Sequence, residues 1–280
     1  MKITFLGTTT LLLDDGADQL LFDCHITRPS MLKYLLGRLK TDAVMAERVI
    51  ARHHIDRLRA IFVSHAHHDH VMDAPYFAVR CGAAVHGSPS ALNVARGGGV
   101  PETRLHAFDP ATPVRVNGFT VRVLPSLHSK ARWYNDDLGR TIDAPLVQPA
   151  PRRRYREGGS FDFLVEHGGR TLLIRPSFNY IEGQLDGIRA DALFLGVAGL
   201  AGADAATRDA FFRETVDKVR PSLVVPVHWD NFFVPLDRPN RGMPRIFEDT
   251  AASLSILAEC CAARGIPCSV LLPGTSIDFG

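Results

Sequence analysis

Short apolar runs bounded by polar turns recur along the chain, and such runs predict β-strands. Asp14-Asp15-Gly16 separates one pair of runs and Asn117-Gly118 another, and both sequences favour tight hairpin turns. The expected strands cover residues 2–6, 9–13, 19–22, 60–63, 83–86, 114–116, 119–124, 160–166, 170–174, 192–195, 223–227 and 268–272.

Longer segments carry apolar residues at helical spacing. Leu32, Leu35, Leu36 and Leu39 fall on one face of the first such segment. This stripe predicts a helix that packs against the core. The expected helices cover residues 29–40, 42–54, 71–81, 88–97, 204–219 and 244–264.

The order of these elements indicates the fold class. Strands come first, strands and helices then alternate, and the arrangement occurs twice. It predicts an α/β fold with two packed sheets and helices outside them, which is a four-layer αββα sandwich. No linker or repeat interrupts the 280 residues, so we expect one domain that covers residues 1–280.

Composition and charge narrow the class of protein. A hydrophobic fraction of 46% and a charged fraction of 22% are typical of soluble globular proteins. A net charge of +2 gives no reason to expect a nucleic-acid partner. The longest uncharged run, residues 192–203, is too short for a transmembrane segment, and no apolar signal segment precedes the first strand. Five cysteines without a Cys-x-x-Cys pair favour a reducing compartment, so we expect a cytoplasmic protein.

The candidate chemistry is concentrated in Ser64-His65-Ala66-His67-His68-Asp69-His70, which follows the expected strand 60–63. In an extended chain His65 and His67 point the same way, because side chains alternate with a period of two. Asp69 and His70 follow at the start of an expected helix. Two imidazoles can therefore hold one metal ion while Asp69 and His70 face a second. These ligand types suit zinc, with manganese or iron as alternatives.

The spacing His-x-His-x-Asp-His between a strand and a helix resembles the metal loop of the metallo-β-lactamase superfamily. A solvated histidine-rich loop is the alternative interpretation. The N-terminal strand pattern and Pro226-Val227-His228-Trp229 are similar to the UlaG-like branch of that superfamily. The resemblance implies one or two zinc ions, a first held by His65, His67 and His128 and a second held by Asp69, His70 and His228.

The resemblance also implies how the site would act. A water or hydroxide between the ions would be the nucleophile, and Asp69 would be the catalytic residue that orients it. Asp23, at the end of an expected strand, would support the metal loop from behind, although a simple strand-end cap is equally compatible. Trp229, Asp230 and Asn231 directly follow a ligand, so they belong either to the pocket wall or to the packing of their loop.

One residue departs from the superfamily pattern. Members with two metal ions usually carry a bridging aspartate after the strand that corresponds to residues 170–174, and this chain has Ser177 there. A serine hydroxyl is a poor bridging ligand, and without the carboxylate two divalent ions repel each other with less compensation. We therefore expect one firmly bound ion at the three-histidine site and a weakly bound second ion.

Residues 129–159 form the least regular segment and include Trp133, Tyr134 and Arg152-Arg153-Arg154-Tyr155-Arg156. A long segment that leaves directly from an expected ligand is expected to fold over the site. Its aromatic side chains would then line a pocket, and its arginines would bind an anionic substrate. A solvated surface loop or a homo-oligomer contact is the alternative.

Together these features predict a metal-dependent hydrolase that acts on a small-molecule ester, lactone or phosphodiester. The alternative is a non-catalytic metal-dependent binding protein with the same fold, and Ser177 is the residue that favours it. The complete set of five histidines and Asp69 favours the enzyme.

Overall fold

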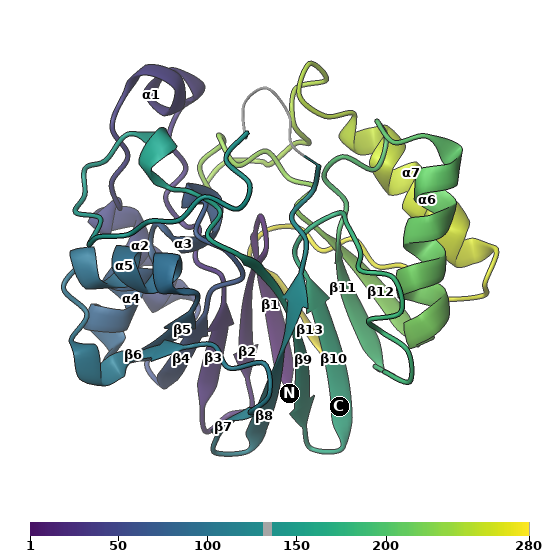
Figure 1. Cartoon of the computed structure of the whole chain (residues 1–280), viewed down its shortest axis with the longest axis horizontal. Helices are drawn as coiled ribbons and strands as arrows, with labels where there is room; N and C mark the ends of the chain where they lie inside the picture. The colour runs from purple at the N-terminus through teal and green to yellow at the C-terminus, as the bar shows by residue number, and fades with distance from the viewer. Residues whose placement is uncertain (131–135, 280) are drawn as a thin grey trace.

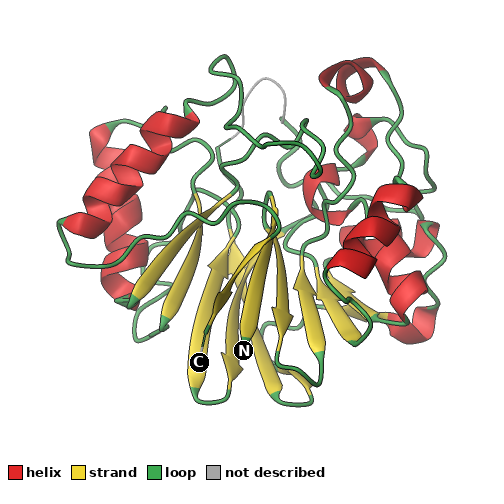
Figure 2. Ribbon diagram, turned by 180° about the vertical axis from the view of Figure 1, so that it is seen from behind, coloured by secondary structure: helices red, strands yellow, loops and turns green. Residues whose placement is uncertain are grey.

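A computed structural model describes residues 1–130 and 136–279 of the chain. Two β-sheets face each other, and helices cover the outer face of each sheet, as Figures 1 and 2 show. This arrangement confirms the predicted α/β, four-layer αββα sandwich. Trp133 and Tyr134 lie outside the described residues.

The first sheet has seven strands and is mixed. Its strands from β13 to β3 are antiparallel neighbours, and those from β3 to β6 are parallel. In spatial order the strands are β13 (Thr275–Asp278), β1 (Lys2–Gly7), β2 (Thr10–Asp14), β3 (Gln19–Phe22), β4 (Leu58–Phe62), β5 (Ala84–Gly87) and β6 (Leu105–Ala107).

The second sheet has six strands and is also mixed. The strands from β7 to β10 are antiparallel neighbours, whereas β10, β11 and β12 are parallel. In spatial order the strands are β12 (Leu223–Val227), β11 (Ala192–Gly196), β10 (Arg170–Arg175), β9 (Ser160–His167), β8 (Phe119–Ser126) and β7 (Val114–Val116).

The helices lie outside the sheets, and several begin at side-chain caps. Ser88, Asp204 and Asp249 each accept a hydrogen bond from a backbone N–H in the first turn of the helix that follows. The helices are α1 (Met31–Leu36), α2 (Ala43–Arg52), α3 (His68–Val71), α4 (Ala74–Cys81), α5 (Pro89–Gly97), α6 (Ala205–Phe212) with a π-helical turn at Arg213–Asp217, and α7 (Thr250–Ala262), besides two short 3₁₀ turns at Glu102–Arg104 and Arg152–Arg154.

Buried aromatic side chains join the two sheets. The ring of Phe22 on β3 lies 5.1 Å from that of Phe62 on β4 and 5.2 Å from that of Phe163 on β9. All three side chains are inaccessible to solvent, as are their aliphatic neighbours on both sheets. Burial of this apolar surface is the main force that holds the sheets face to face.

The leucine stripe predicted for the first helix is wrong. The helix is confined to α1, because the chain turns extended at Gly37, and none of the helix residues is buried. Leu32, Leu35 and Leu36 are 68%, 47% and 83% exposed, whereas Leu39 is buried beyond the helix, where it pairs with Ala150. The helical spacing of the leucines was real, but the helix lies at the upper rim of the molecule (Figure 1), away from both sheets.

Two predictions near the C-terminus also fail. The helix expected from residue 244 begins at Thr250, because Asp249 caps it and the preceding residues form turns. The strand expected at residues 268–272 is reduced to one bridge between Cys268 and Val224. The last strand is instead β13, which adds to the free edge of β1.

Strand direction brings several chain segments to one edge of the sandwich. In the first sheet β3 and β4 are parallel, so the residues after both strands lie at the same edge. In the second sheet β8, β10 and β12 run in one direction, because β9 is antiparallel to both β8 and β10. Within the described ranges, no helix is both long enough and apolar enough to cross a lipid bilayer.

Candidate metal centre

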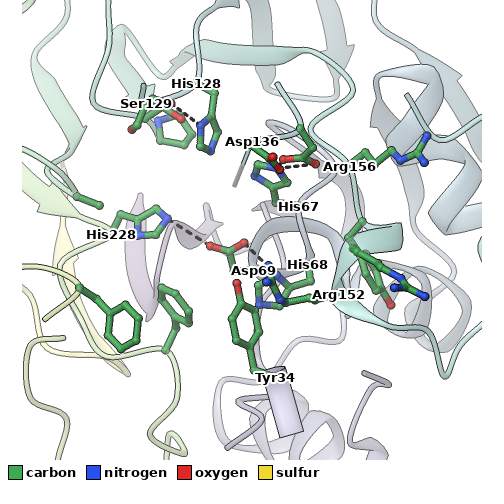
Figure 3. A pocket seen from close by; sticks show the side chains of 18 of the residues that line it. Tyr34, His67, His68, Asp69, His128, Ser129, Asp136, Arg152, Arg156 and His228 are labelled. Carbon is green, nitrogen blue, oxygen red and sulfur yellow. Dashed lines mark hydrogen bonds and ion pairs between the residues drawn. The ribbon is translucent and has the colours of Figure 1, made fainter. Parts of the chain in front are cut away.

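The predicted metal ligands come from strand ends in both sheets. The histidine-rich loop follows β4, and His128 comes two residues after β8. His228 directly follows β12. These strand ends meet at the upper edge of the sandwich, and the side chains converge there (Figure 3).

The structure groups the six predicted ligands into two clusters. Within each cluster the potential ligand atoms lie within 4.8 Å of one another. The first cluster contains three imidazoles, and the second contains two imidazoles and one carboxylate. The two clusters are His65, His67 and His128, and Asp69, His70 and His228.

The donor set fits a divalent transition metal. Nitrogen and carboxylate ligands of this kind are typical of zinc and related ions. The Nε2 atom of His65 is buried and has no hydrogen-bond partner among the described residues, as expected of an atom that awaits a ligand. The rings of His65, His67 and His128 lie 4.8 Å apart in each pairing, so they enclose a common space.

Burial favours the neutral form that a metal-ligating histidine requires. Burial and the adjacent imidazoles hold the pKa of His65 well below its usual value. Burial likewise lowers the pKa of His128 to about 3. Both side chains are therefore neutral at pH 7 even without an ion.

Asp69 lies at the centre of the cluster of side chains (Figure 3). Its Oδ2 is 3.4 Å from Nε2 of His228 and 3.6 Å from Nε2 of His70, and its Oδ1 is 3.4 Å from Nδ1 of His68. Burial alone would raise the pKa of the Asp69 carboxyl. His70, His68 and His228 outweigh that effect and hold the pKa well below its usual value, so Asp69 carries a negative charge.

Asp23 lies behind the histidine loop. Its Oδ2 is 2.7 Å from Nδ1 of His70 and accepts a hydrogen bond from the hydroxyl of Thr9, and its Oδ1 accepts one from the N–H of Ser64. With Nδ1 of His70 protonated toward Asp23, Nε2 is free to face the centre. The positive φ of Asp23, 51°, aims the carboxylate at the loop.

A buried ion pair fixes the segment that follows His228. The side chains of Arg28 and Asp230 are fully buried, and their closest charged atoms lie 2.7 Å apart. Asp230 also accepts a hydrogen bond from the N–H of Thr8, and Arg28 donates to the carbonyl of Asn231. A side chain on Gly7 would collide with Arg28, since a Cβ there would lie 1.9 Å from Nη2.

The residues after His228 divide into packing residues and cavity residues. Trp229 is 6% exposed and packs in the core with its ring 6.4 Å from Phe5, while Asp230 and Asn231 bond to Arg28. The next two residues, Phe232 and Phe233, line a cavity that opens from the candidate metal centre. The packing alternative for residues 229–231 therefore matches their placement, and the sequence analysis overlooked the two phenylalanines.

Ser177 lies in the cavity wall, two residues after β10, and is 7% exposed. Its backbone is held close to Gly196, because a Cβ at Gly196 would lie 2.2 Å from the Pro176 carbonyl oxygen and 3.0 Å from the Ser177 nitrogen. The backbone at Ser177 therefore has little room to shift, and the residue belongs to the lining that also contains His128 and His228.

The metal centre opens into a cavity of about 440 Å³, a volume in the range of small-molecule sites. Asp136, Asp137, Arg140 and residues 152–156 of the long irregular segment contribute to its wall. One of them, Asp137, has its Oδ1 3.1 Å from Nε2 of His67. Arginine and aromatic side chains of the lining are Arg140, Arg152, Arg153, Arg154, Arg156, Tyr34, Tyr155, Phe232, Phe233 and Phe247.

Two further cavity residues were missed by the sequence analysis. His68, which the sequence analysis did not assign as a ligand, is buried at the cavity wall beside Asp69. The ring of Tyr34 lies 5.0 Å from that of His68 and points its hydroxyl toward the centre in Figure 3. No spacing pattern marks Tyr34, because the fold alone brings α1 to the histidine loop.

Several proteins that resemble this chain over nearly its full length are named as metal-dependent hydrolases or metallo hydrolases, which agrees with a candidate metal centre. A "UPF0173 metal-dependent hydrolase" of Carboxydothermus hydrogenoformans is 23% identical over 99% of both chains. A protein of the same name from Heliobacterium modesticaldum is 24% identical over 100% of this chain and 98% of its own. Among solved structures, the metallo hydrolase Igni18 of Ignicoccus hospitalis superposes with a TM-score of 0.59 at 16% identity, covering 100% of this chain and 99% of its own.

The sequence also matches a family of defined fold. The family described as Beta-lactamase superfamily domain matches residues 18–229, which is more than half of the chain and contains all six predicted ligands. The chain therefore belongs to the Beta-lactamase superfamily domain family and has the metallo-β-lactamase fold.

Proposed function

We propose that the protein hydrolyses an ester, lactone or phosphodiester bond of an anionic small molecule through a metal-activated water. The observation that carries this proposal is the pair of donor clusters, four of whose six residues line one cavity. The arginine-rich wall of the same cavity supports an anionic substrate, because guanidinium groups bind carboxylate and phosphate oxygens in pairs of hydrogen bonds.

The general assignment is that of a metal-dependent hydrolase, because relatives with that name align with this chain over nearly their full length. Our proposal adds zinc as the ion, with manganese or iron as alternatives, and places the chain in the UlaG-like branch. It also includes a single domain and a cytoplasmic location. The alternative for the exposed arginines is that they form a contact between copies of the protein in a homo-oligomer.

His65, His67 and His128 would hold a first ion, and Asp69, His70 and His228 a second. A divalent ion supplies Lewis-acid chemistry there, and it lowers the pKa of water to about 7. Asp23 keeps His70 oriented, and the buried pair of Arg28 and Asp230 keeps the segment after His228 in place.

Asp69 has a second role in this proposal. Its carboxylate is ionised and reaches both His68 and His228, so one oxygen can accept a hydrogen bond from the attacking water and orient it. The described parts of residues 129–159 would cover the cavity and limit the access of bulk water, since Asp136, Asp137, Arg140 and residues 152–156 contribute to its wall.

A panel of chromogenic phosphodiester, ester and lactone substrates tests the proposal on protein loaded with Zn²⁺ or Mn²⁺. Turnover of one substrate class that His65→Ala abolishes supports a hydrolase at this centre. His106→Ala is the matched control, because His106 is an exposed histidine on β6 and its loss should leave turnover unchanged.

The alternative function is a metal-dependent binding protein, and Ser177 in place of a bridging aspartate is the observation that favours it. It predicts metal content that His65→Ala removes, without turnover of any substrate class in the panel. Metal analysis beside the kinetic assay therefore separates the two functions.

A further inference from the structure

One wall of the cavity is an unbroken series of aromatic rings. The series starts at His228, whose ring lies 6.0 Å from that of Phe232. Phe233 follows at 4.6 Å from Phe232, and Tyr34 follows at 5.2 Å from Phe233. Apolar surface therefore leads from a predicted metal ligand to helix α1.

The apolar surface continues outward along α1. Leu35, directly after Tyr34, lines the cavity and is 47% exposed. Leu32 and Leu36 on the same helix are 68% and 83% exposed. Helix α1 lies at the upper rim of the molecule (Figure 1), and its exposed leucines therefore place further apolar surface on the element that carries Tyr34 and Leu35.

The cavity lining also contains five arginines, together with the carboxylate residues Asp136, Asp137 and Glu248. Arg152, Arg153 and Arg154 form a 3₁₀ turn that lines the cavity, and Arg140 and Arg156 lie in the same lining. Arg152 joins the arginines to the aromatic series, since its guanidinium carbon lies 5.0 Å from the centre of the Tyr34 ring. A ligand in the cavity thus meets both arginine side chains and apolar surface, which adjoin each other at Arg152 and Tyr34.

We propose that the site takes an amphiphilic anion, that is, a molecule with a carboxylate or phosphate group and an alkyl chain. The anionic group binds the arginines, and the chain lies along Tyr34 and Leu35 and then over α1. This inference rests on the proposed function, because it assigns the substrate class of the same cavity.

The observations favour a single small amphiphile as the occupant of the leucine surface. The surface is continuous with the ring series that ends at His228, so a chain that lies on it leads to the metal centre. The arginines border the same cavity and complement an anionic group at the inner end of the chain. A second copy of the protein or a membrane would cover the leucines without explaining this continuity.

Binding of alkylphosphonates of increasing length, from methyl to octyl, tests the assignment on the zinc-loaded protein. Isothermal titration calorimetry below the micelle concentration should show the affinity rising about twofold per methylene, as expected when about half of each added CH₂ is buried. The affinity should also fall with salt, because the arginines are solvent-accessible.

Leu35→Gln should flatten the dependence on chain length, so that octylphosphonate binds about as weakly as the shorter probes. Val79→Gln is the matched control, since Val79 on α4 is 48% exposed and lies outside the cavity lining. Leu36→Gln gives a second test at a residue that is 83% exposed and supports no core contact.

Several results would overturn the inference. Equal affinity for all chain lengths would exclude the alkyl subsite. Self-association that Leu36→Gln abolishes, seen by sedimentation velocity, would assign α1 to a second copy. Binding to phosphatidylglycerol vesicles but not to free alkylphosphonates would assign it to a membrane. Turnover in the substrate panel, together with alkylphosphonate affinities that do not depend on chain length, would refute the inference and leave the proposed function intact.

Discussion

The predicted metal centre has little negative charge among its ligands, and Ser177 is the position where the superfamily pattern would add more. In the two donor clusters of the described residues, Asp69 is the single carboxylate, while the other five side chains are imidazoles. Two divalent ions would bring four positive charges into this space, and neutral imidazoles compensate none of them. Ser177 lines the same cavity as His128 and His228, so we expect a carboxylate at this position to add negative charge near the ions.

Ser177→Asp should raise the metal content after dialysis from about one ion per chain toward two. The added carboxylate lowers the repulsion between the ions and offers each of them an oxygen ligand. Elemental analysis of the dialysed protein measures the effect, and Ser177→Asn, which has the same size without the charge, is the control. Two ions retained by the unmodified protein would contradict the assignment of this role to the missing carboxylate.

His86 makes stability depend on pH at a distance from the metal ligands. Its ring stacks between those of Phe62 and His106, at 4.8 Å from each, and burial lowers its pKa to about 4. A histidine in the unfolded chain has a pKa near 6.5. The contribution of the neutral, buried His86 ring to the unfolding free energy is therefore fully present above pH 6.5 and is lost as the pH falls through 4.

His86→Phe should remove this part of the acid sensitivity. Between pH 7 and pH 5 the wild-type protein should lose about 2 kcal/mol more unfolding free energy than the variant. In the wild-type protein, protonation of His86 in the unfolded chain favours unfolding as the pH falls, and phenylalanine cannot be protonated. Urea denaturation at the two pH values measures the difference. Equal losses in both proteins would show that His86 ionises normally in the folded state.

At the scale of elements, the segment after β12 depends on a partner far away in sequence. Arg28 precedes α1, yet its buried guanidinium holds Asp230 and the carbonyl of Asn231. Phe232 and Phe233 follow directly and form part of the cavity wall. One buried pair thus positions both the segment after a predicted ligand and the aromatic side of the cavity.

Arg28→Met should lower the unfolding free energy by about 3–5 kcal/mol, because it leaves the Asp230 carboxylate buried without its partner. Chemical denaturation provides the measurement. Arg48→Met is the matched control, since Arg48 is 65% exposed in its side chain and its 3.8 Å ion pair with Asp237 should contribute less than about 1 kcal/mol. Similar losses in the two variants would contradict the special role of Arg28.

The sequence predicted most strands correctly because β1, β3, β9, β10 and β12 are buried runs bounded by turn residues. Helix α1 shows the limit of such reasoning. Periodicity reports that an apolar face exists, but the partner of that face depends on tertiary placement. β13 was missed for a related reason, since it is an exposed edge strand with a weak apolar pattern.

The candidate site was predictable to a similar extent. Ligand spacing within the histidine loop is local, and His128 and His228 follow recognisable strands. Tyr34, Arg28 and Phe232 were missed because their roles arise from contacts between segments that no local pattern records. Metal binding by the six predicted ligands and the identity of the ion stay predictions.

At the scale of the whole molecule, the predicted metal centre draws its ligands from segments that follow strands of both sheets. The histidine loop belongs to the first sheet, whereas His128, Ser177 and His228 follow strands of the second. An ion shared by these segments can bind only when the sheets are packed together. The free energy of metal binding should therefore add to the free energy of unfolding.

Removal of the metal with a chelator should lower the melting temperature. An ion present at a thousand times its dissociation constant contributes about 4 kcal/mol to the unfolding free energy. Differential scanning calorimetry with and without EDTA measures the change, and His65→Ala should show a much smaller response. An unchanged melting temperature in the wild-type protein would show that the ion does not hold the two sheets together.

Three residues around the centre have left-handed backbone conformations that cost non-glycine residues about 1–3 kcal/mol each. They are Thr8, Asp23 and His228, with φ values of 54°, 51° and 60°. Each contributes to the predicted metal centre, as a ligand or through a hydrogen bond to one. A laboratory selection for heat resistance under metal depletion should therefore collect glycine at Asp23 and His228 and lose metal binding, whereas a selection for activity should preserve both residues. Glycine at Thr8 keeps the backbone carbonyl that accepts a hydrogen bond from the His228 N–H, so both selections should tolerate it.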